Sequence, residues 1–294
     1  MSIKLITFDL DDTLWDTAPV IATAEVVLRD WLEANAPTLG SVPVEHLFAI
    51  RERLVQAEPG LKHRISALRR RVLFHALEEV GYSEQHAQAL ANEGFEVFLH
   101  ARHQVEIFPE VQPVLEILRH QYILGVVTNG NADVSRLGLA DYFRFALCAE
   151  DLGIGKPDPA PFLEALRRGE VDAGAAVHIG DHPGDDIAGA QRAGLRAVWF
   201  NPQGKAWLAI RRRTPRSSAC RNYLTCLHAG ADGAALRPIR GHAPSHRDRA
   251  GPEPVVNLWE RACPRRGRHG QHKTHRRKKK PAATAGFFCD QPLR

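Results

Sequence analysis

Several features of membrane, secreted and disulfide-bonded proteins are missing from the first 204 residues of this 294-residue chain. No run of about 18 apolar residues occurs there that could span a bilayer. The chain starts without the charged segment and apolar stretch of a signal peptide. Cys148 is the only cysteine before Cys220, which excludes a disulfide framework in this part. We therefore expect a cytoplasmic protein without a membrane span.

The formal net charge of +5 averages two unlike parts of the chain. Residues 1–204 hold 18 Lys and Arg against 29 Asp and Glu, whereas residues 205–294 hold 21 against 5. The second part sustains neither a helical nor a strand-like apolar period, so we predict a basic tail of low order. It could bind nucleic acid, be a solvated disordered segment, or be translated out of frame. The abrupt change of composition after Lys205 favours the last interpretation, and we do not expect nucleic-acid binding.

Apolar spacing in the first part predicts a strand followed by a helical insert. The residues from Ile3 to Phe8 are apolar or β-prone, as in a strand buried on both faces of a parallel sheet. Residues 19–101 carry only helical spacing. The helices predicted within the insert cover about 19–35, 44–57, 62–80 and 83–101.

From Phe108 onward, the pattern alternates between helix and strand. The strands predicted here cover 123–128, 145–148, 176–179 and 196–200. The predicted helices cover about 111–120, a short stretch near Asp133, 159–168 and 187–193. With the first strand, this order indicates a five-stranded, doubly wound, Rossmann-like parallel sheet. The predicted domains are a core of residues 1–16 and 105–204, an all-helical insert of residues 17–104, and the tail of residues 205–294.

Chemically active residues gather where the predicted strands end. Asp9, Asp11 and Asp12 follow the first strand, Thr128 closes the second, and Asp181 follows the fourth. Doubly wound sheets carry their sites at the carboxyl ends of the strands, so we expect these residues to lie together. So many like charges raise the electrostatic free energy unless a cation lies among them. Taken alone, Asp12-Thr13 is also typical of a helix cap.

Four motifs occur in order within residues 3–201. They are Asp9-x-Asp11-x-Thr13, Val127-Thr128-Asn129-Gly130, Gly155-Lys156-Pro157 and Ile179-Gly-Asp181-His-Pro-Gly-Asp185-Asp186. The third is no P-loop, because the G-x-x-x-x-G-K-[ST] frame is absent. Together the motifs resemble the haloacid dehalogenase superfamily of phosphatases. The resemblance implies that the helical insert is a cap of the kind that closes over small substrates.

The resemblance also implies a role for the two carboxylates of the first motif. Asp9 would attack phosphorus to form an aspartyl-phosphate and would bind Mg²⁺. Asp11 would protonate the leaving alcohol and then activate the hydrolytic water, while its backbone carbonyl binds the metal. True dehalogenases of the superfamily lack an acid at the position of Asp11, since halide leaves without a proton. The presence of Asp11 therefore favours phosphoryl transfer.

The other three motifs would hold the phosphate and the metal. By resemblance, Thr128 and the backbone N–H of Asn129 bind the phosphoryl oxygens, and Lys156 balances the charge of phosphate and Asp9. Asp181 would be the carboxylate ligand of the metal. Asp186 would hold a metal-bound water or orient Lys156, with Asp185 as the weaker candidate for that position. His178 lies in a predicted apolar strand and is interpreted as a core histidine.

A closer resemblance concerns the substrate. Asp9-Leu-Asp-Asp-Thr-Leu-Trp-Asp16-Thr-Ala-Pro and Thr128-Asn-Gly-Asn-Ala132 are similar to a bacterial riboflavin-pathway phosphatase family. That family acts on the ribitylaminouracil phosphate precursor of riboflavin and on FMN. The alternatives within the superfamily are a sugar-phosphate or nucleotide phosphatase and a phosphomutase. A catalytically silent scaffold is a further alternative, which the intact set of Asp9, Asp11, Lys156 and Asp181 argues against. We expect a small phosphorylated metabolite as partner, and a monomer or weak dimer.

Overall fold

The computed structural model describes residues 2–202 of the chain. The predicted tail lies outside the described residues. The described chain divides into two compact units, one of residues 2–16 with 106–202 and one of residues 17–105. None of the helices in residues 2–202 has both the length and the apolar character that a membrane span needs. The assignment of the two units as catalytic core and cap stays a prediction.

The first unit is built on a five-stranded sheet in the order β3-β2-β1-β4-β5. All neighbouring strands are parallel. The strands are β1 (Leu5–Phe8), β2 (Ile123–Thr128), β3 (Phe145–Cys148), β4 (Ala176–Gly180) and β5 (Arg196–Trp199). The predicted doubly wound parallel sheet is thereby confirmed, with the first strand of the chain at its centre.

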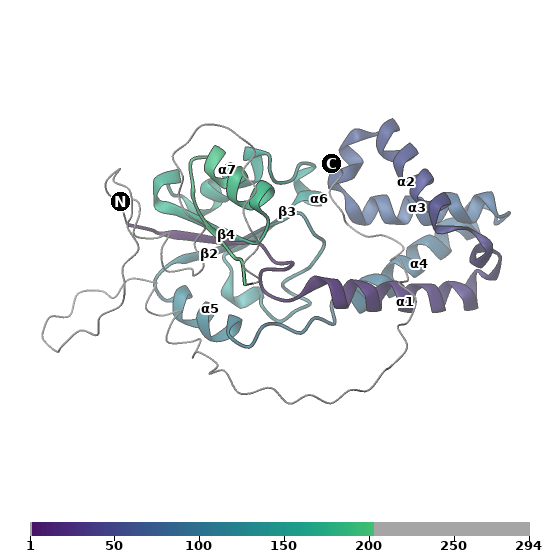
Figure 1. Cartoon of the computed structure of the whole chain (residues 1–294), viewed down its shortest axis with the longest axis horizontal. Coiled ribbons are helices and arrows are strands. Elements are labelled where there is room, and N and C mark those ends of the chain that lie inside the picture. The colour runs from purple at the N-terminus through teal and green to yellow at the C-terminus, as the bar shows by residue number, and fades with distance from the viewer. Residues whose placement is uncertain (1, 203–294) are drawn as a thin grey trace, which may run out of the picture. The chain divides into compact units, whose positions relative to one another are not determined.

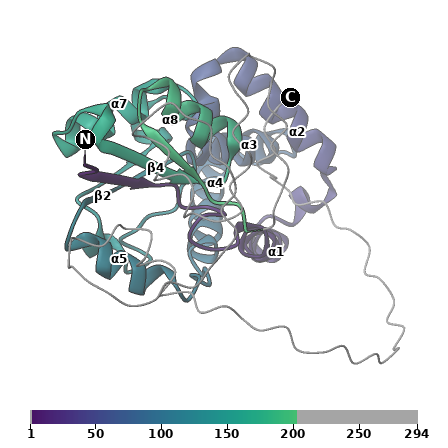
Figure 2. The same ribbon diagram turned by 60° about the vertical axis from the view of Figure 1, so that its left-hand side comes forward.

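Helices cover both faces of this sheet. Helix α5 lies on one face, and α7 and α8 lie on the other (Figures 1 and 2). Their bounds, with the short α6, are α5 (Val111–Arg119), α6 (Ala149–Leu152), α7 (Pro159–Gly169) and α8 (Gly189–Arg192). Because both faces are covered, the residues of β1 are all buried, which explains its continuous apolar run.

The unit's core between the sheet and α7 is tightly packed. Phe162 of α7 is fully buried and belongs to one cluster with Leu5 of β1 and Val127 of β2. At Gly125 of β2, an added Cβ would lie 2.4 Å from the ring of Phe145 on β3. This approach requires glycine, because real Cβ atoms do not tolerate such distances. This packing joins α7 and the neighbouring strands into one core.

Within residues 17–105, the second unit consists of helices without strands. Its α-helices are α1 (Thr17–Asn35), α2 (Val44–Ala57), α3 (Ile65–Glu79) and α4 (Glu84–Arg102). Short 3₁₀ turns cover Pro37–Ser41 and Pro59–His63. Ser83 caps α4, since its side chain accepts a hydrogen bond from the backbone N–H of His86.

The helical unit buries an ion pair between two of its helices. Arg69 Nη1 of α3 lies 2.7 Å from Glu25 Oε1 of α1, and both side chains are at most 9% exposed. The Arg69 guanidinium also lies 3.6 Å from the centre of the Phe98 ring of α4. Three helices therefore meet at this point, and burying the pair carries a desolvation cost.

Three predicted helices differ from the structure. The stretch near Asp133 is a turn, because the Asp133 side chain accepts from Ser135 N and Gly138 takes a positive φ of 68°. The helix predicted over 62–80 begins only at Ile65, after the 3₁₀ turn that buries Leu61. The helix predicted over 187–193 is a π-helix, Pro183–Ala188, followed by α8.

Candidate active site

The carboxyl ends of β1, β2 and β4 bring most of the predicted site residues together. Asp9 directly follows β1, and its backbone N–H donates to Ile179 O of β4 at 2.8 Å. Thr128 is the last residue of β2, and Asp181 directly follows β4. In the sheet, β1 lies between β2 and β4. The central strand therefore carries Asp9 between the two neighbouring motifs.

Lys156 links two buried carboxylates. Its Nζ lies 2.7 Å from Asp9 Oδ1 and 2.6 Å from Asp186 Oδ1. The three side chains are at most 10% exposed. A buried ammonium between two carboxylates is a strong charge-assisted arrangement. One ammonium, however, cannot neutralise both carboxylates.

Asn129 holds the backbone of Lys156 through its side chain. Its Nδ2 donates to Lys156 O at 2.8 Å, and its Oδ1 accepts from Lys156 N at 2.8 Å. The fit is close, because an added Cβ at Gly155 would lie 2.5 Å from Asn129 Oδ1. The amide pair joins the end of β2 to the loop that carries the lysine. Asn129 therefore positions Lys156 in addition to its predicted backbone role.

Asp186 accepts hydrogen bonds on both carboxylate oxygens. Oδ1 accepts from Lys156 and from His178 Nε2 at 3.1 Å, and Oδ2 accepts from His182 N at 2.8 Å. At Gly180, an added Cβ would lie 2.3 Å from Asp186 Cγ, so only glycine permits this approach. These contacts hold Asp186 against Lys156, and the two roles predicted for Asp186 stay predictions.

His178 is buried but connected to the site. Its Nδ1 lies 2.9 Å from Thr7 Oγ1 of the neighbouring strand. Burial lowers the pKa of His178. The neutral imidazole therefore donates from Nε2 to Asp186 and accepts the Thr7 hydroxyl proton at Nδ1. The predicted core histidine is fully buried and also supports Asp186.

The remaining predicted residues, Thr128, Asp11 and Asp185, make hydrogen bonds with other partners. The Thr128 hydroxyl oxygen accepts from Gly130 N at 3.0 Å, in a turn at the strand end. Asp11 Oδ1 accepts from the indole Nε1 of Trp15 at 3.0 Å. Asp185 does not join the carboxylate cluster, and its backbone N–H donates to His182 Nδ1 at 3.0 Å.

The electrostatics of the cluster show which carboxylates lack a counter-charge. Burial raises the pKa of Asp9 to about 8, and Asp186 and Asp11 add to the rise against the effect of Lys156. Burial, with Asp186 and Asp12, raises the pKa of Asp181 to about 6. Burial also opposes ionisation of Asp186, but Lys156 and His178 hold the pKa of Asp186 below its usual range. Asp9 and Asp181 are therefore the carboxylates whose negative charge is least compensated by nearby positive charge.

These carboxylates fit a divalent cation. One oxygen each from Asp9, Asp181 and Asp186 lies within 4.8 Å of the other two. Hard carboxylate oxygens are the ligands that Mg²⁺ prefers, and it needs only one or two of them. Asp186 is already occupied by Lys156, His178 and His182, so Asp9 and Asp181 are the available carboxylate donors. A cation there would relieve the repulsion that raises their pKa values.

Residues 3–194 match the family described as haloacid dehalogenase-like hydrolase. The chain belongs to the haloacid dehalogenase-like hydrolase family. The resemblance drawn from the four motifs is thereby confirmed, and the protein is a hydrolase.

Three proteins of this kind are similar to this chain over most of their own length. The 5-amino-6-(5-phospho-D-ribitylamino)uracil phosphatase YigB of Escherichia coli K12 is 33% identical over 68% of this chain and 84% of its own. The solved structure of a 2-haloacid dehalogenase from Pseudomonas syringae pv. tomato DC3000 is 75% identical, with a TM-score of 0.70, covering 71% and 91%. The magnesium-bound HAD-hydrolase YfnB of Bacillus subtilis is 26% identical, with a TM-score of 0.50, covering 70% and 92%.

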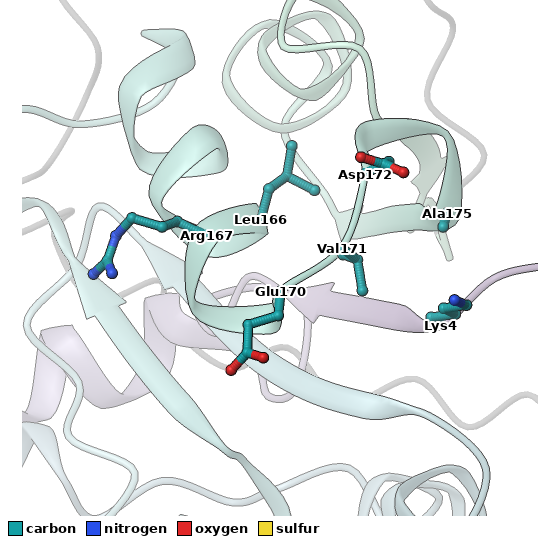
Figure 3. Close-up of a pocket in the computed structure, with 7 residues that line it drawn as sticks. All are labelled: Lys4, Leu166, Arg167, Glu170, Val171, Asp172 and Ala175. Atoms are coloured by element: carbon teal, nitrogen blue, oxygen red, sulfur yellow. The ribbon is translucent and has the colours of Figure 1, made fainter.

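A hollow in the first unit lies away from the carboxylates. It has a volume of about 330 Å³ and is lined by residues near the amino ends of β1 and β4 and the end of α7 (Figure 3). The lining residues are Lys4, Leu166, Arg167, Glu170, Val171, Asp172 and Ala175. None of the predicted site residues lines it. Its two basic and two acidic side chains balance each other, so it favours neither anions nor cations.

The raised pKa of Asp9 predicts how pH affects stability in the metal-free hydrolase. A carboxylate with a folded-state pKa of about 8 binds more protons in the folded chain than in the unfolded chain between about pH 4 and about pH 8. The free energy of unfolding therefore falls as pH rises through this window. We expect the metal-free Tm to fall between about pH 6.5 and about pH 8.5, above the ordinary pKa of histidine.

Magnesium and an Asp9→Asn variant separate this effect from other titrations. Mg²⁺ should raise Tm more at the upper pH than at the lower one, because the ion competes with the extra proton. Asp9→Asn should show a smaller fall with pH and a smaller Mg²⁺ effect. Thermal unfolding followed by circular dichroism measures both. Equal pH profiles of the wild type and Asp9→Asn would contradict the assignment of the uncompensated charge to Asp9.

Proposed function

We propose that the protein is a Mg²⁺-dependent phosphomonoester hydrolase that works through an aspartyl-phosphate on Asp9. The observation that carries this proposal is the Lys156 ammonium held 2.7 Å from the Asp9 carboxylate, with the acid Asp11 two residues further on. A phosphomonoester is a dianion, so an anionic nucleophile needs a fixed cation to approach it. Asp9 and Lys156 supply that combination.

In the first half of the proposed reaction, Asp9 displaces the alcohol. A carboxylate oxygen of Asp9 bonds to phosphorus as the bond from phosphorus to the ester oxygen breaks. The carboxylic proton of Asp11 passes to the departing oxygen, which leaves as an alcohol. Thr128, through its hydroxyl, and Asn129, through its backbone N–H, hold the phosphoryl oxygens, and Lys156 offsets their charge.

In the second half, water releases the phosphate. Asp11, now a carboxylate, takes a proton from water as the water oxygen bonds to phosphorus. The bond between phosphorus and the Asp9 oxygen breaks, which regenerates the Asp9 carboxylate and leaves the proton on Asp11. The same residue therefore acts as acid and then as base, and each cycle consumes one water.

Mg²⁺ would be held by the carboxylates of Asp9 and Asp181 and by the backbone carbonyl of Asp11. It supplies positive charge that offsets the charge of Asp9 and of the phosphate. The available oxygens of Asp9 and Asp181 support this assignment, as does the magnesium reported for the Bacillus subtilis relative. Asp186 and His178 hold Lys156 in place and need not bind the ion. Asp185 has no role in this scheme.

For the substrate we propose the ribitylaminouracil phosphate precursor of riboflavin, or FMN. The similarity to the Escherichia coli ribitylaminouracil phosphatase supports this choice, together with the extended match around Asp9 and Thr128. The alternatives are a sugar phosphate or a nucleotide, hydrolysed by the same chemistry, or transfer of the phosphoryl group within a sugar. All are small soluble phosphate esters, and the protein would bind no nucleic acid.

A second candidate function is hydrolytic dehalogenation of a 2-haloacid. The 75% identity to a Pseudomonas syringae 2-haloacid dehalogenase favours it. In that reaction Asp9 would displace halide from carbon and water would then hydrolyse the ester. Halide leaves without a proton, so this chemistry has no use for Asp11 as an acid. The presence of Asp11 makes us prefer the phosphatase.

One assay separates these functions. Full-length protein is incubated, with Mg²⁺ or with EDTA, with FMN, the ribitylaminouracil phosphate, glucose 6-phosphate, a nucleoside monophosphate and 2-chloropropionate. Released phosphate and chloride are both measured, with product analysis for phosphoryl transfer. We expect phosphate from the flavin-related esters, abolished by EDTA, and no chloride. Chloride without phosphate would establish the second candidate, and neither product from folded protein would overturn both.

A further inference from the structure

Trp15 contacts the proposed acid directly. Its indole Nε1 donates to Asp11 Oδ1 at 3.0 Å. The side chain is fully buried, with 0% exposure, and is the largest of the fully buried side chains in the described part of the chain. A buried indole N–H needs an acceptor, and here the acceptor is a reacting carboxylate.

The backbone of Trp15 is paired with two other segments of the chain. Trp15 forms isolated β-bridges with Asp11 and with Ile107. Beside it, Phe108 N donates to Leu14 O at 3.0 Å. The backbone at Trp15 is thus held by the segment that carries Asp11 and by the segment that returns from the helical insert. The fully buried ring is closely packed, which keeps its N–H at Asp11.

We propose that Trp15 is the positioning residue for Asp11, and that it determines which carboxylate oxygen carries the transferable proton. This inference rests on the proposed phosphatase function. The indole is a donor only, so Oδ1 stays an acceptor in both protonation states of Asp11. The proton given to the leaving alcohol, and later taken from water, is assigned to Oδ2. In this proposal Trp15 acts through Asp11 and not on the substrate.

The test uses the dependence of rate on the leaving group. A p-nitrophenolate leaves without help from an acid, whereas an alkoxide needs the proton of Asp11. We compare kcat/KM of wild type, Trp15→Phe and Asp11→Asn on FMN and on p-nitrophenyl phosphate. For Trp15→Phe, we expect a loss of about 10-fold or more on the alkyl ester and less than about 3-fold on the aryl ester. Asp11→Asn should show the same selectivity with a larger loss.

The ratio of the losses on the two esters distinguishes a positioning role of Trp15 from a purely structural role. Equal losses on both esters in Trp15→Phe would overturn the inference, because a packing defect weakens all substrates alike. No turnover of either ester by the wild type would instead count against the proposed function. Trp31→Phe, which alters a tryptophan of the helical unit, is the matched control and should keep the wild-type ratio of the two rates.

A second measurement covers a Trp15→Phe variant that fails to fold. Wild type and Asp11→Ala are labelled with ¹⁵N-tryptophan, and the indole N–H resonances of the five tryptophans are compared. Loss of the side-chain acceptor should move one indole resonance strongly and leave the others in place. Unchanged indole resonances in Asp11→Ala would overturn the contact on which the inference depends.

Discussion

Asp9→Asn is expected to lower phosphate release by about 10⁴-fold or more while leaving the protein folded. The amide cannot form the acyl-phosphate bond, so the two-step route is lost as a whole. The fold should be retained because Asp9 is a charge that the folded chain tolerates at a cost, as its raised pKa indicates. Removing that charge should leave Tm in metal-free buffer equal to or above that of the wild type.

The measurement is phosphate release from the best ester of the panel, with Tm recorded on the same sample. Asp172→Asn is the matched control, because Asp172 is exposed at the amino end of β4 and far from the proposed chemistry. Its activity should equal that of the wild type. An Asp9→Asn variant that keeps more than about a hundredth of the activity would contradict a covalent intermediate on this residue.

Lys156→Met is expected to damage both activity and stability. The substitution keeps an unbranched side chain but leaves Asp9 and Asp186 facing each other without the ammonium that lies 2.7 and 2.6 Å from them. Breaking a buried ion pair from one side costs about 3–5 kcal/mol of unfolding free energy. Loss of the charge that offsets the phosphate should lower kcat/KM by about 10²-fold or more.

A double variant distinguishes the two effects. Lys156→Met with Asp186→Asn removes one of the two unmatched carboxylates and their mutual repulsion, so urea unfolding should show part of the lost stability restored while phosphate release stays low. Lys4→Met serves as control, since the Lys4 side chain is exposed at the start of the sheet and should be replaceable without loss. Wild-type stability in the single Lys156→Met variant would contradict a buried bridge between Asp9 and Asp186.

The strands and the site residues at their ends could largely be predicted because they depend on local sequence patterns. The continuous apolar run before Asp9 predicted a buried parallel strand, and β2 and β3 have the bounds that their patterns predicted. Thr128 and Asp181 were placed at the site because parallel strands share one carboxyl edge. The π-helix after Asp181 was missed, since single-turn π geometry leaves no periodicity that distinguishes it from an α-helix.

The supporting contacts could not be predicted from such patterns. Asn129 reaches the backbone of Lys156 across 27 positions of sequence, and Thr7 meets His178 across 171. Which residues face each other depends on strand order and register, and these follow from packing of the whole unit. Gly180 lies one residue beyond the predicted strand, so its close approach to Asp186 carried no signal in the sequence pattern.

The central position of β1 has a consequence for how the chain assembles during synthesis. The first strand to leave the ribosome pairs with β2 and β4, whose residues begin at Ile123 and Ala176. Residues 17–105, by contrast, form a contiguous unit with contacts that are closer in sequence. The helical unit can therefore form its core before β2 and β4 are available to pair with Leu5–Phe8. During that interval an apolar strand is exposed, and the translating cell must keep it from aggregating.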